Sequence, residues 1–244
     1  MRVAQINPDT YVDGMGNRAS VYVQGCSIRC PGCQNPHMFE RSGGREMTIG
    51  EIASELHAKA KSRKLTIIGG EPTEQAFEVS ELILLLERMG WEHFVVYTGR
   101  TYESLCQDIV GVTTGTLSDA VVKSLSNIHY SPAELDERYR TGVWGILMMA
   151  DVLVDGPYMK DQDDDRLQYR GSRNQRVIDL AAMRSAGDML TIITRPDWDE
   201  PHVTITTDGR ILGAKGLMID LVQDDAKLET ARRCGQGKYH ETKD

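Results

Sequence analysis

Apolar and polar residues alternate from Arg18 to Gly25, in "RASVYVQG", so that Ala19, Val21 and Val23 share one side of an extended chain. A two-residue period is typical of a strand with one buried face. The stretch therefore predicts a first strand, which ends where a loop rich in cysteine begins.

The pattern changes to helical spacing after this loop. A capping box at Thr48 and Glu51 predicts a helix start. The apolar residues that recur at helical spacing behind it are Ile49, Ile52, Leu56 and Ala60. A second helix is predicted after Thr73, its expected cap, and Gly90 should end it.

Two further apolar runs predict buried strands. The first, "KLTIIGGEP" (64–72), precedes the second helix, and "EHFVVYTGR" (92–100) follows it. The order so far is strand, cysteine loop, helix, strand, helix, strand. This repeating order predicts an α/β fold with a parallel sheet covered by helices.

Residues 101–149 are expected to be mainly helical, and Ser131-Pro132 with Glu134 should start one helix. Short buried strands are predicted at "DVLVDG" (151–156) and around Val177.

The residue pattern changes from about Arg184, where strand and turn signals follow the β/α repeat. "HVTITTDGRILGAKG" predicts a hairpin that turns at Asp208-Gly209, and "LMIDLV" (217–222) a further strand or short helix. We therefore expect a β/α domain over 1–183, in which 101–149 is a mainly helical insertion. A C-terminal extension over 184–244 would hold the hairpin and a tail.

Composition and charge narrow the functional classes. The 244 residues carry a formal net charge of -8, whereas a dedicated nucleic-acid binder would be basic. No apolar run approaches membrane-spanning length, and the N-terminal residues lack the apolar core of a signal peptide. We expect a cytoplasmic protein that binds neither nucleic acid nor membrane. Five cysteines, three of them in one loop, favour metal binding or redox chemistry over a disulfide framework.

Cys26, Cys30 and Cys33 follow the first strand with the spacing C-x3-C-x2-C. A structural zinc site normally has four ligands, whereas a [4Fe–4S] cube held by three thiolates keeps one iron open to a substrate. An open cluster is the leading interpretation. A closed zinc site and a chance crowding of buried thiols are the alternatives. The residues that could complete a closed site are Cys106, Cys234 and His37.

Gly69-Gly70-Glu71-Pro72 ends the second predicted strand at the same edge of the sheet as the cysteine loop. Ligands bind at this edge in β/α folds. The glycines would let a ligand approach the backbone closely, and the carboxylate could accept hydrogen bonds from an ammonium group. By itself the stretch could also be an ordinary strand-end turn.

Together these motifs resemble the radical S-adenosylmethionine enzymes. "CPGCQNP", "YTGR", "DVLVDGPYM" and "RGSRNQRVIDL" occur in the order seen in the activating proteins of anaerobic ribonucleotide reductase. The resemblance covers approximately residues 1–100 and 150–180. It implies a partial, open β/α barrel of the radical S-adenosylmethionine type with a small, β-rich C-terminal extension.

The resemblance also implies the chemistry. A reduced [4Fe–4S] cluster would cleave S-adenosylmethionine to methionine and a 5'-deoxyadenosyl radical, which takes a hydrogen atom from a glycine Cα of a partner. The implied cofactors are the cluster and S-adenosylmethionine. The implied partners are a glycyl radical enzyme, with anaerobic (class III) ribonucleoside-triphosphate reductase as first choice, and an electron donor such as flavodoxin or ferredoxin.

The site residues follow from the same resemblance, with no catalytic residue beyond cluster and cofactor ligands. The cluster ligands would be Cys26, Cys30 and Cys33. The residues that would bind S-adenosylmethionine or face the incoming glycine loop are Gly69, Gly70, Glu71, Thr98, Gly99, Asp155, Arg170, Ser172, Asn174 and Gln175. As alternatives, "YTGR" and "DG" could be simple turns and "RGSRNQ" a solvated loop.

Two departures from the family pattern bear on the function, and the second, the length of the chain, leaves the partner open. Gly32 stands where many members of the superfamily carry an aromatic residue, although glycine is usual in the activase branch. The chain is also longer than compact activases. An enzyme acting on another glycyl radical protein, a peptide or a small metabolite would share every cluster and cofactor residue. The alternative from a different class is a non-catalytic Fe–S or zinc protein.

Overall fold

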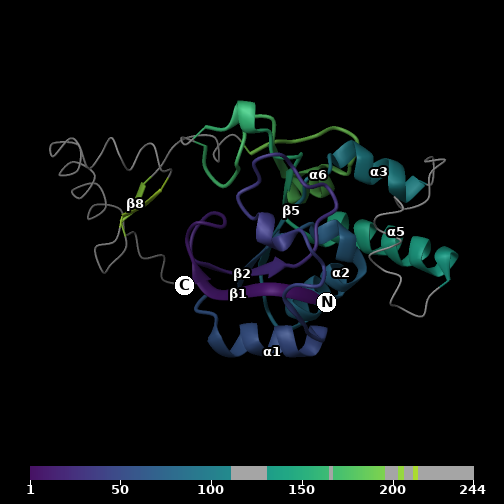
Figure 1. Cartoon of the computed structure of the whole chain (residues 1–244), viewed down its shortest axis with the longest axis horizontal. Coiled ribbons are helices and arrows are strands. Elements are labelled where there is room, and N and C mark those ends of the chain that lie inside the picture. The colour runs from purple at the N-terminus through teal and green to yellow at the C-terminus, as the bar shows by residue number, and fades with distance from the viewer. Residues whose placement is uncertain (111–130, 165–166, 196–202, 206–210, 214–244) are drawn as a thin grey trace.

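A computed structural model describes residues 1–110, 131–164, 167–195, 203–205 and 211–213 of the chain (Figure 1). The predicted turn at Asp208-Gly209, the segment 217–222 and Cys234 lie outside the described residues. The predicted hairpin is confirmed in its two strands, because β8 (Val203–Ile205) pairs antiparallel with β9 (Ile211–Gly213).

A seven-stranded sheet with the order β3-β1-β2-β4-β5-β6-β7 forms the centre of the fold. Its strands are β1 (Arg2–Thr10), β2 (Arg18–Val23), β3 (Arg45–Glu46), β4 (Lys64–Gly69), β5 (His93–Tyr97), β6 (Val152–Asp155) and β7 (Arg176–Asp179). The four central strands β2, β4, β5 and β6 are parallel. The predicted β/α sheet is therefore confirmed, as an open, partial barrel.

The antiparallel strands β1 and β3 were not predicted. β1 ends in "NPDT", and proline, asparagine and aspartate are all depleted in strands. Its pairing with β2 contains two register irregularities, and only Val3 and Thr10 are buried. The strand lies near the edge of the sheet, where such residues are tolerated and where the alternation of apolar side chains is weak.

Five helices are described: α1 (Ile49–Lys59), α2 (Ala76–Arg88), α3 (Tyr102–Val110), α5 (Pro132–Met149) and α6 (Leu180–Ala186). Figure 1 shows α1, α2 and α5 against the sheet. The predicted capping boxes are present at Thr48 with Glu51 and at Ser131 with Glu134. Both described parts of residues 101–149 are helical, and no described helix is long and apolar enough to cross a membrane.

The predicted cap at Thr73 is wrong. Thr73 lies inside a short 3-10 turn, η2 (Pro72–Gln75), which is capped by the side chain of Glu71, and α2 begins only at Ala76. The reason is that Thr73 donates both its backbone N–H and its hydroxyl to Glu71, so the threonine serves as a donor. Gly90 ends the helix as predicted, with φ at +82°.

The alternation of side chains along the parallel strands divides the core into two clusters. On one face Leu65 and Ile67 are fully buried in a large cluster that includes Leu56 of α1, Leu86 of α2 and Ile146 of α5. Each such side chain stabilises the fold by about 1.5–3 kcal/mol. The opposite face holds a smaller cluster whose buried members are Val95, Val152, Val154 and Val177.

Helix α5 packs closely on α2 because α5 presents two glycines, Gly142 and Gly145, to α2. A Cβ atom on Gly142 would lie 2.2 Å from the backbone nitrogen of Phe77, and one on Gly145 would lie 2.7 Å from Cβ of Ser80. The predicted helical segment is thereby fixed to the barrel through α2.

Candidate functional site

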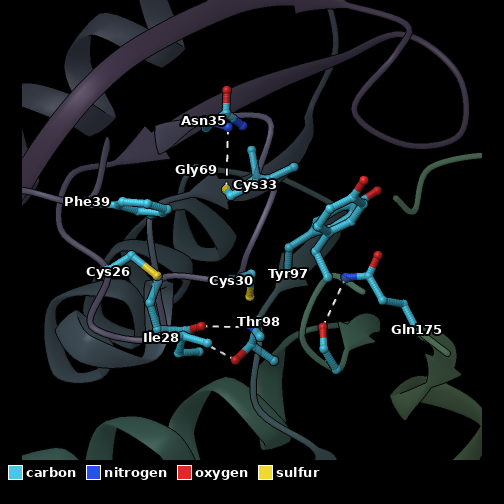
Figure 2. Close-up of a pocket in the computed structure, with 16 residues that line it drawn as sticks. Cys26, Ile28, Cys30, Cys33, Asn35, Phe39, Gly69, Tyr97, Thr98 and Gln175 are labelled. Atoms are coloured by element: carbon cyan, nitrogen blue, oxygen red, sulfur yellow. Dashed lines mark hydrogen bonds between the residues drawn. The ribbon is translucent and has the colours of Figure 1, made fainter. Parts of the chain in front are cut away.

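A pocket lies where the parallel strands end, next to the cysteine loop (Figure 2). Figure 2 shows the cysteines and Phe39 on one side of it and Tyr97 and Gln175 on the other. The described residues that line it are Cys26, Ile28, Cys30, Cys33, Asn35, Phe39, Ile68, Gly69, Gly70, Glu71, Tyr97, Thr98, Gly99, Gly156, Tyr158 and Gln175. All three predicted cluster ligands are among them.

The cysteine loop folds back on itself to present its thiols. The backbone N–H of Cys26 donates to the carbonyl of Phe39 at 3.0 Å, and that of Cys33 donates to the carbonyl of Cys30 at 3.1 Å. The backbone N–H of Asn35 donates to Sγ of Cys33 at 3.4 Å. Arg29, between the first two cysteines, adopts φ of +51°, a left-handed conformation that is uncommon outside glycine and often found at functional sites.

Burial governs the ionisation of two of these thiols. It raises the pKa of Cys26 to about 11 and also raises the pKa of Cys30, although backbone N–H groups partly oppose it. A metal or cluster would displace the thiol protons, since the thiolate is the ligand form. Among the described residues, no three His, Cys, Asp or Glu side chains gather closely enough to share one ion. All three thiols of the loop line the pocket.

The glycines after β4 are required by the neighbouring loop. A Cβ atom on Gly70 would lie 2.2 Å from the carbonyl oxygen of Gly25, and Gly69 adopts φ of +106°. The backbone N–H groups of Gly70 and Glu71 donate to the carbonyls of Val23 and Gly25, both at 2.8 Å. The Gly-Gly-Glu turn is therefore fastened directly to the start of the cysteine loop.

The carboxylate of Glu71 is buried and receives four hydrogen bonds. Its Oε1 accepts from the N–H and the hydroxyl of Thr73, at 3.0 and 2.7 Å, and from the hydroxyl of Thr98 at 2.8 Å. Among the described residues, Oε2 accepts from the N–H of Gly99 alone, at 2.8 Å. Oε2 is therefore the less engaged of the two carboxylate oxygens, with one bond against three at Oε1. Burial raises the pKa of Glu71, against these hydrogen bonds.

Thr98 and Gly99 line the pocket, and both donate hydrogen bonds to Glu71. Their contact with a cofactor stays a prediction. Gly99 also stands against the cysteine loop, because a Cβ atom there would lie 2.7 Å from Cδ1 of Ile28. The turns that follow β4 and β5 and the cysteine loop thus form one interlocked wall.

Asp155 lies outside the pocket lining, and its carboxylate is occupied. Oδ2 accepts from the backbone N–H of Tyr102 at 2.7 Å, and Oδ1 accepts from Nε of Arg176 at 3.0 Å. Arg176 also binds both carboxylate oxygens of Glu103 and lowers the pKa of that residue to about 2. These contacts tie β6, β7 and α3 together, so the structure supports a scaffolding role for Asp155. Direct contact with a cofactor remains a prediction.

The residues predicted in the polar block Arg170–Gln175 do not all line the pocket. Gln175 lines the pocket, whereas Arg170, Ser172 and Asn174 do not. Arg170 donates to the carbonyl of Gln175 at 2.8 Å, and Ser172 is fully buried and donates to Asn174 at 2.7 Å. Their side chains bind one another and nearby backbone carbonyls of the same chain.

Sequence patterns missed several lining residues, namely Ile28, Asn35, Phe39, Ile68, Tyr97 and Tyr158. Tyr97 ends β5 directly before the predicted Thr98, and Tyr158 follows the end of β6 by three residues, so their closeness to strand ends carried a signal. Phe39 carried none, because it reaches the pocket only through the turn η1 (Pro36–Met38).

The alternative ligands His37 and Cys106 lie outside the described lining. His37 is exposed in η1, and Cys106 is half-buried in α3. Neither joins the three cysteines of the loop in the pocket.

Comparison with known proteins places this site in context. A family model described as a 4Fe-4S single cluster domain matches residues 12–178. A Vibrio cholerae serotype O1 protein is 31% identical over 182 residues, covering 72% of this chain and 97% of the relative. A Haemophilus influenzae protein is 28% identical with the same coverage, and an Escherichia coli K12 protein is 26% identical over 181 residues, again covering 72% and 97%. Each relative is named anaerobic ribonucleoside-triphosphate reductase-activating protein.

Proposed function

Because the chain belongs to the radical S-adenosylmethionine activase family with a single [4Fe–4S] cluster domain, we propose that it generates a glycyl radical on a partner enzyme. The proposed partner is an anaerobic ribonucleoside-triphosphate reductase. The observation that carries the proposal is the convergence of three thiols from one loop with the Glu71 carboxylate on a single pocket.

The residues fit the cluster and its cofactor. Cys26, Cys30 and Cys33 would each hold a different iron and leave the fourth open, where the amino and carboxylate groups of S-adenosylmethionine would bind. A cluster held there would supply the single electron needed to cleave the sulfonium of the cofactor.

Glu71 is proposed to accept a hydrogen bond from an N–H of the cofactor's amino group through Oε2. Among the described residues that oxygen receives one hydrogen bond, against three at Oε1, and Glu71 lines the pocket. A hydrogen bond to a buried carboxylate favours its charged form, so this donor would offset part of the cost of burying the charge. The interlocked turns after β4 and β5 hold Oε2 in place before the cofactor arrives.

The remaining wall is suited to controlling a carbon radical. Ile28, Phe39 and Ile68 are apolar lining residues, and the hydroxyl of Tyr97 is committed to the carbonyl of Tyr169. Such a surface excludes water from the reacting atoms and offers few exposed donors, which limits side reactions.

The choice of partner rests on the relatives, whose names specify this reductase. The reducing electron would come from a flavodoxin or a ferredoxin. The proposed location of the reaction is the cytoplasm. Both are proposals about this chain.

The test is anaerobic reconstitution of the full chain with iron and sulfide. We expect about four irons per chain, a reduced cluster whose EPR signal changes with S-adenosylmethionine, and release of 5'-deoxyadenosine. Adding the candidate reductase should produce a glycyl radical EPR doublet. Cys30→Ser should lose the cluster, and Cys106→Ser is the matched control that should keep it. Cofactor cleavage without a doublet would refute the proposed partner, and a single bound zinc without cleavage would refute the enzyme.

A further inference from the structure

The segment Gly156–Lys160, here called the rim segment, lies between the strand β6 and the cysteine loop. Its Tyr158 is half-buried and lines the pocket. The side chain of Lys160 packs on Gly32, since a Cβ atom there would lie 3.0 Å from Cδ of Lys160. The rim segment therefore meets the cysteine loop at Gly32, between Cys30 and Cys33.

Three side chains of the block Arg170–Gln175 bind the rim segment at successive points. Nε2 of Gln175 donates to the carbonyl of Gly156 at 3.0 Å, and Nδ2 of Asn174 donates to the carbonyl of Pro157 at 2.7 Å. The hydroxyl of Ser172 accepts from the backbone N–H of Met159 at 3.1 Å. Backbone groups on both sides of Tyr158 are thus fixed, while Tyr158 itself is left to face the pocket.

Hydrogen bonds within the block Arg170–Gln175 also fix its own conformation. Oε1 of Gln175 accepts from the backbone N–H groups of Gly171 and Ser172, at 2.7 and 3.2 Å. The ring of Tyr158 rests on Gly171, because a Cβ atom there would lie 3.0 Å from Cδ2 of the ring. The side chain of Arg173, by contrast, points to the surface, where it pairs with Asp164.

We propose that Ser172, Asn174 and Gln175 are positioning residues that hold Tyr158 against the cysteine loop, where its ring shields the cluster from solvent and lowers the reduction potential. The inference rests on the cluster of the proposed function. Reduction adds one negative charge to the cluster, and a less hydrated surrounding disfavours the added charge. Water admitted beside Cys30 and Cys33 would therefore raise the potential.

The experiment uses the reconstituted full chain without S-adenosylmethionine, with iron content and circular dichroism as checks of loading and folding. Two quantities are measured: the midpoint potential, by EPR-monitored titration, and the rate at which a soluble chelator removes the cluster. Tyr158→Ala should raise the potential and accelerate cluster loss several-fold, whereas Tyr158→Phe should match the parent chain. Gln175→Ala should also accelerate cluster loss, and the double variant should add little, because both changes remove the same shield.

Arg173→Ala is the matched control, since it alters the block without touching the rim segment, and it should leave both quantities unchanged. An unchanged potential in Tyr158→Ala would overturn the inference while leaving the proposed function intact. Fully additive effects in the double variant would overturn the positioning role of Gln175. A parent chain that assembles no cluster would overturn both proposals.

Discussion

Replacing Glu71 by Gln would remove one negative charge from the pocket while keeping the length and shape of the side chain. The amide can accept hydrogen bonds at its oxygen but must donate at its nitrogen. Threonine hydroxyls can rotate to accept from it, whereas backbone N–H groups cannot. In either orientation the amide nitrogen therefore faces a fixed donor, the N–H of Gly99 or the N–H of Thr73.

Two costs follow from this change. The buried N–H left without a partner should cost about 1–3 kcal/mol of folding stability. The amino group of S-adenosylmethionine would also lose a hydrogen bond to a charged carboxylate, worth about 1.5–3 kcal/mol, which corresponds to a dissociation constant raised about tenfold to over a hundredfold. The thiols are untouched, so cluster content should stay at the parent level.

The assay is anaerobic titration of the reconstituted variant with S-adenosylmethionine, together with iron analysis and thermal unfolding. Thr98→Val provides a graded comparison, because it keeps the charge and removes only one hydrogen bond to Oε1. Its affinity should lie between those of the parent and Glu71→Gln. Unchanged cofactor affinity in Glu71→Gln, or loss of the cluster with affinity retained, would refute the role given to this carboxylate.

Two further predictions concern the scaffold. Gly70→Ala should lower iron content after reconstitution, because its Cβ atom would displace the cysteine loop at Gly25. Gly50→Ala, where a Cβ atom meets nothing within 4 Å, is the control and should keep the parent's iron content. Equal iron content in both variants would contradict a close contact between the Gly-Gly-Glu turn and the cysteine loop. Arg176→Met should lower the free energy of unfolding by about 3–5 kcal/mol, measured by urea denaturation, because it leaves the Asp155 carboxylate buried and unpaired. Since Arg176 depresses the folded-state pKa of Glu103 to about 2, the parent should keep this stabilisation above the ordinary carboxyl pKa and lose it as the pH falls towards 2. Arg176→Met should show a weaker pH dependence over that range, and an unaltered pH profile would count against the ion pair.

The sequence by itself determined the parts of the protein that local rules govern. The strand at "RASVYVQG", the capping boxes at Thr48 and Ser131, and the stop at Gly90 all depend on neighbouring residues, and the structure confirms each of them. The alternation in that strand does not mark one exposed face, however, because Arg18 and Ser20 are also fully buried. The cysteine spacing likewise identified the loop that lines the pocket, because all three thiols lie on one short stretch.

Only the tertiary structure decided which residues of the distant motifs contact one another and which of them line the pocket. Glycines that a ligand could have required are required instead by the cysteine loop, and Asp155 binds Arg176 in place of facing the pocket. "RGSRNQ" lies some 140 residues after the cysteines, yet it supports Tyr158 beside them. Such roles depend on which carbonyls and donors meet across neighbouring strands, such as the antiparallel pair β6 and β7, and that register is fixed by the packing of the whole sheet rather than by any one segment.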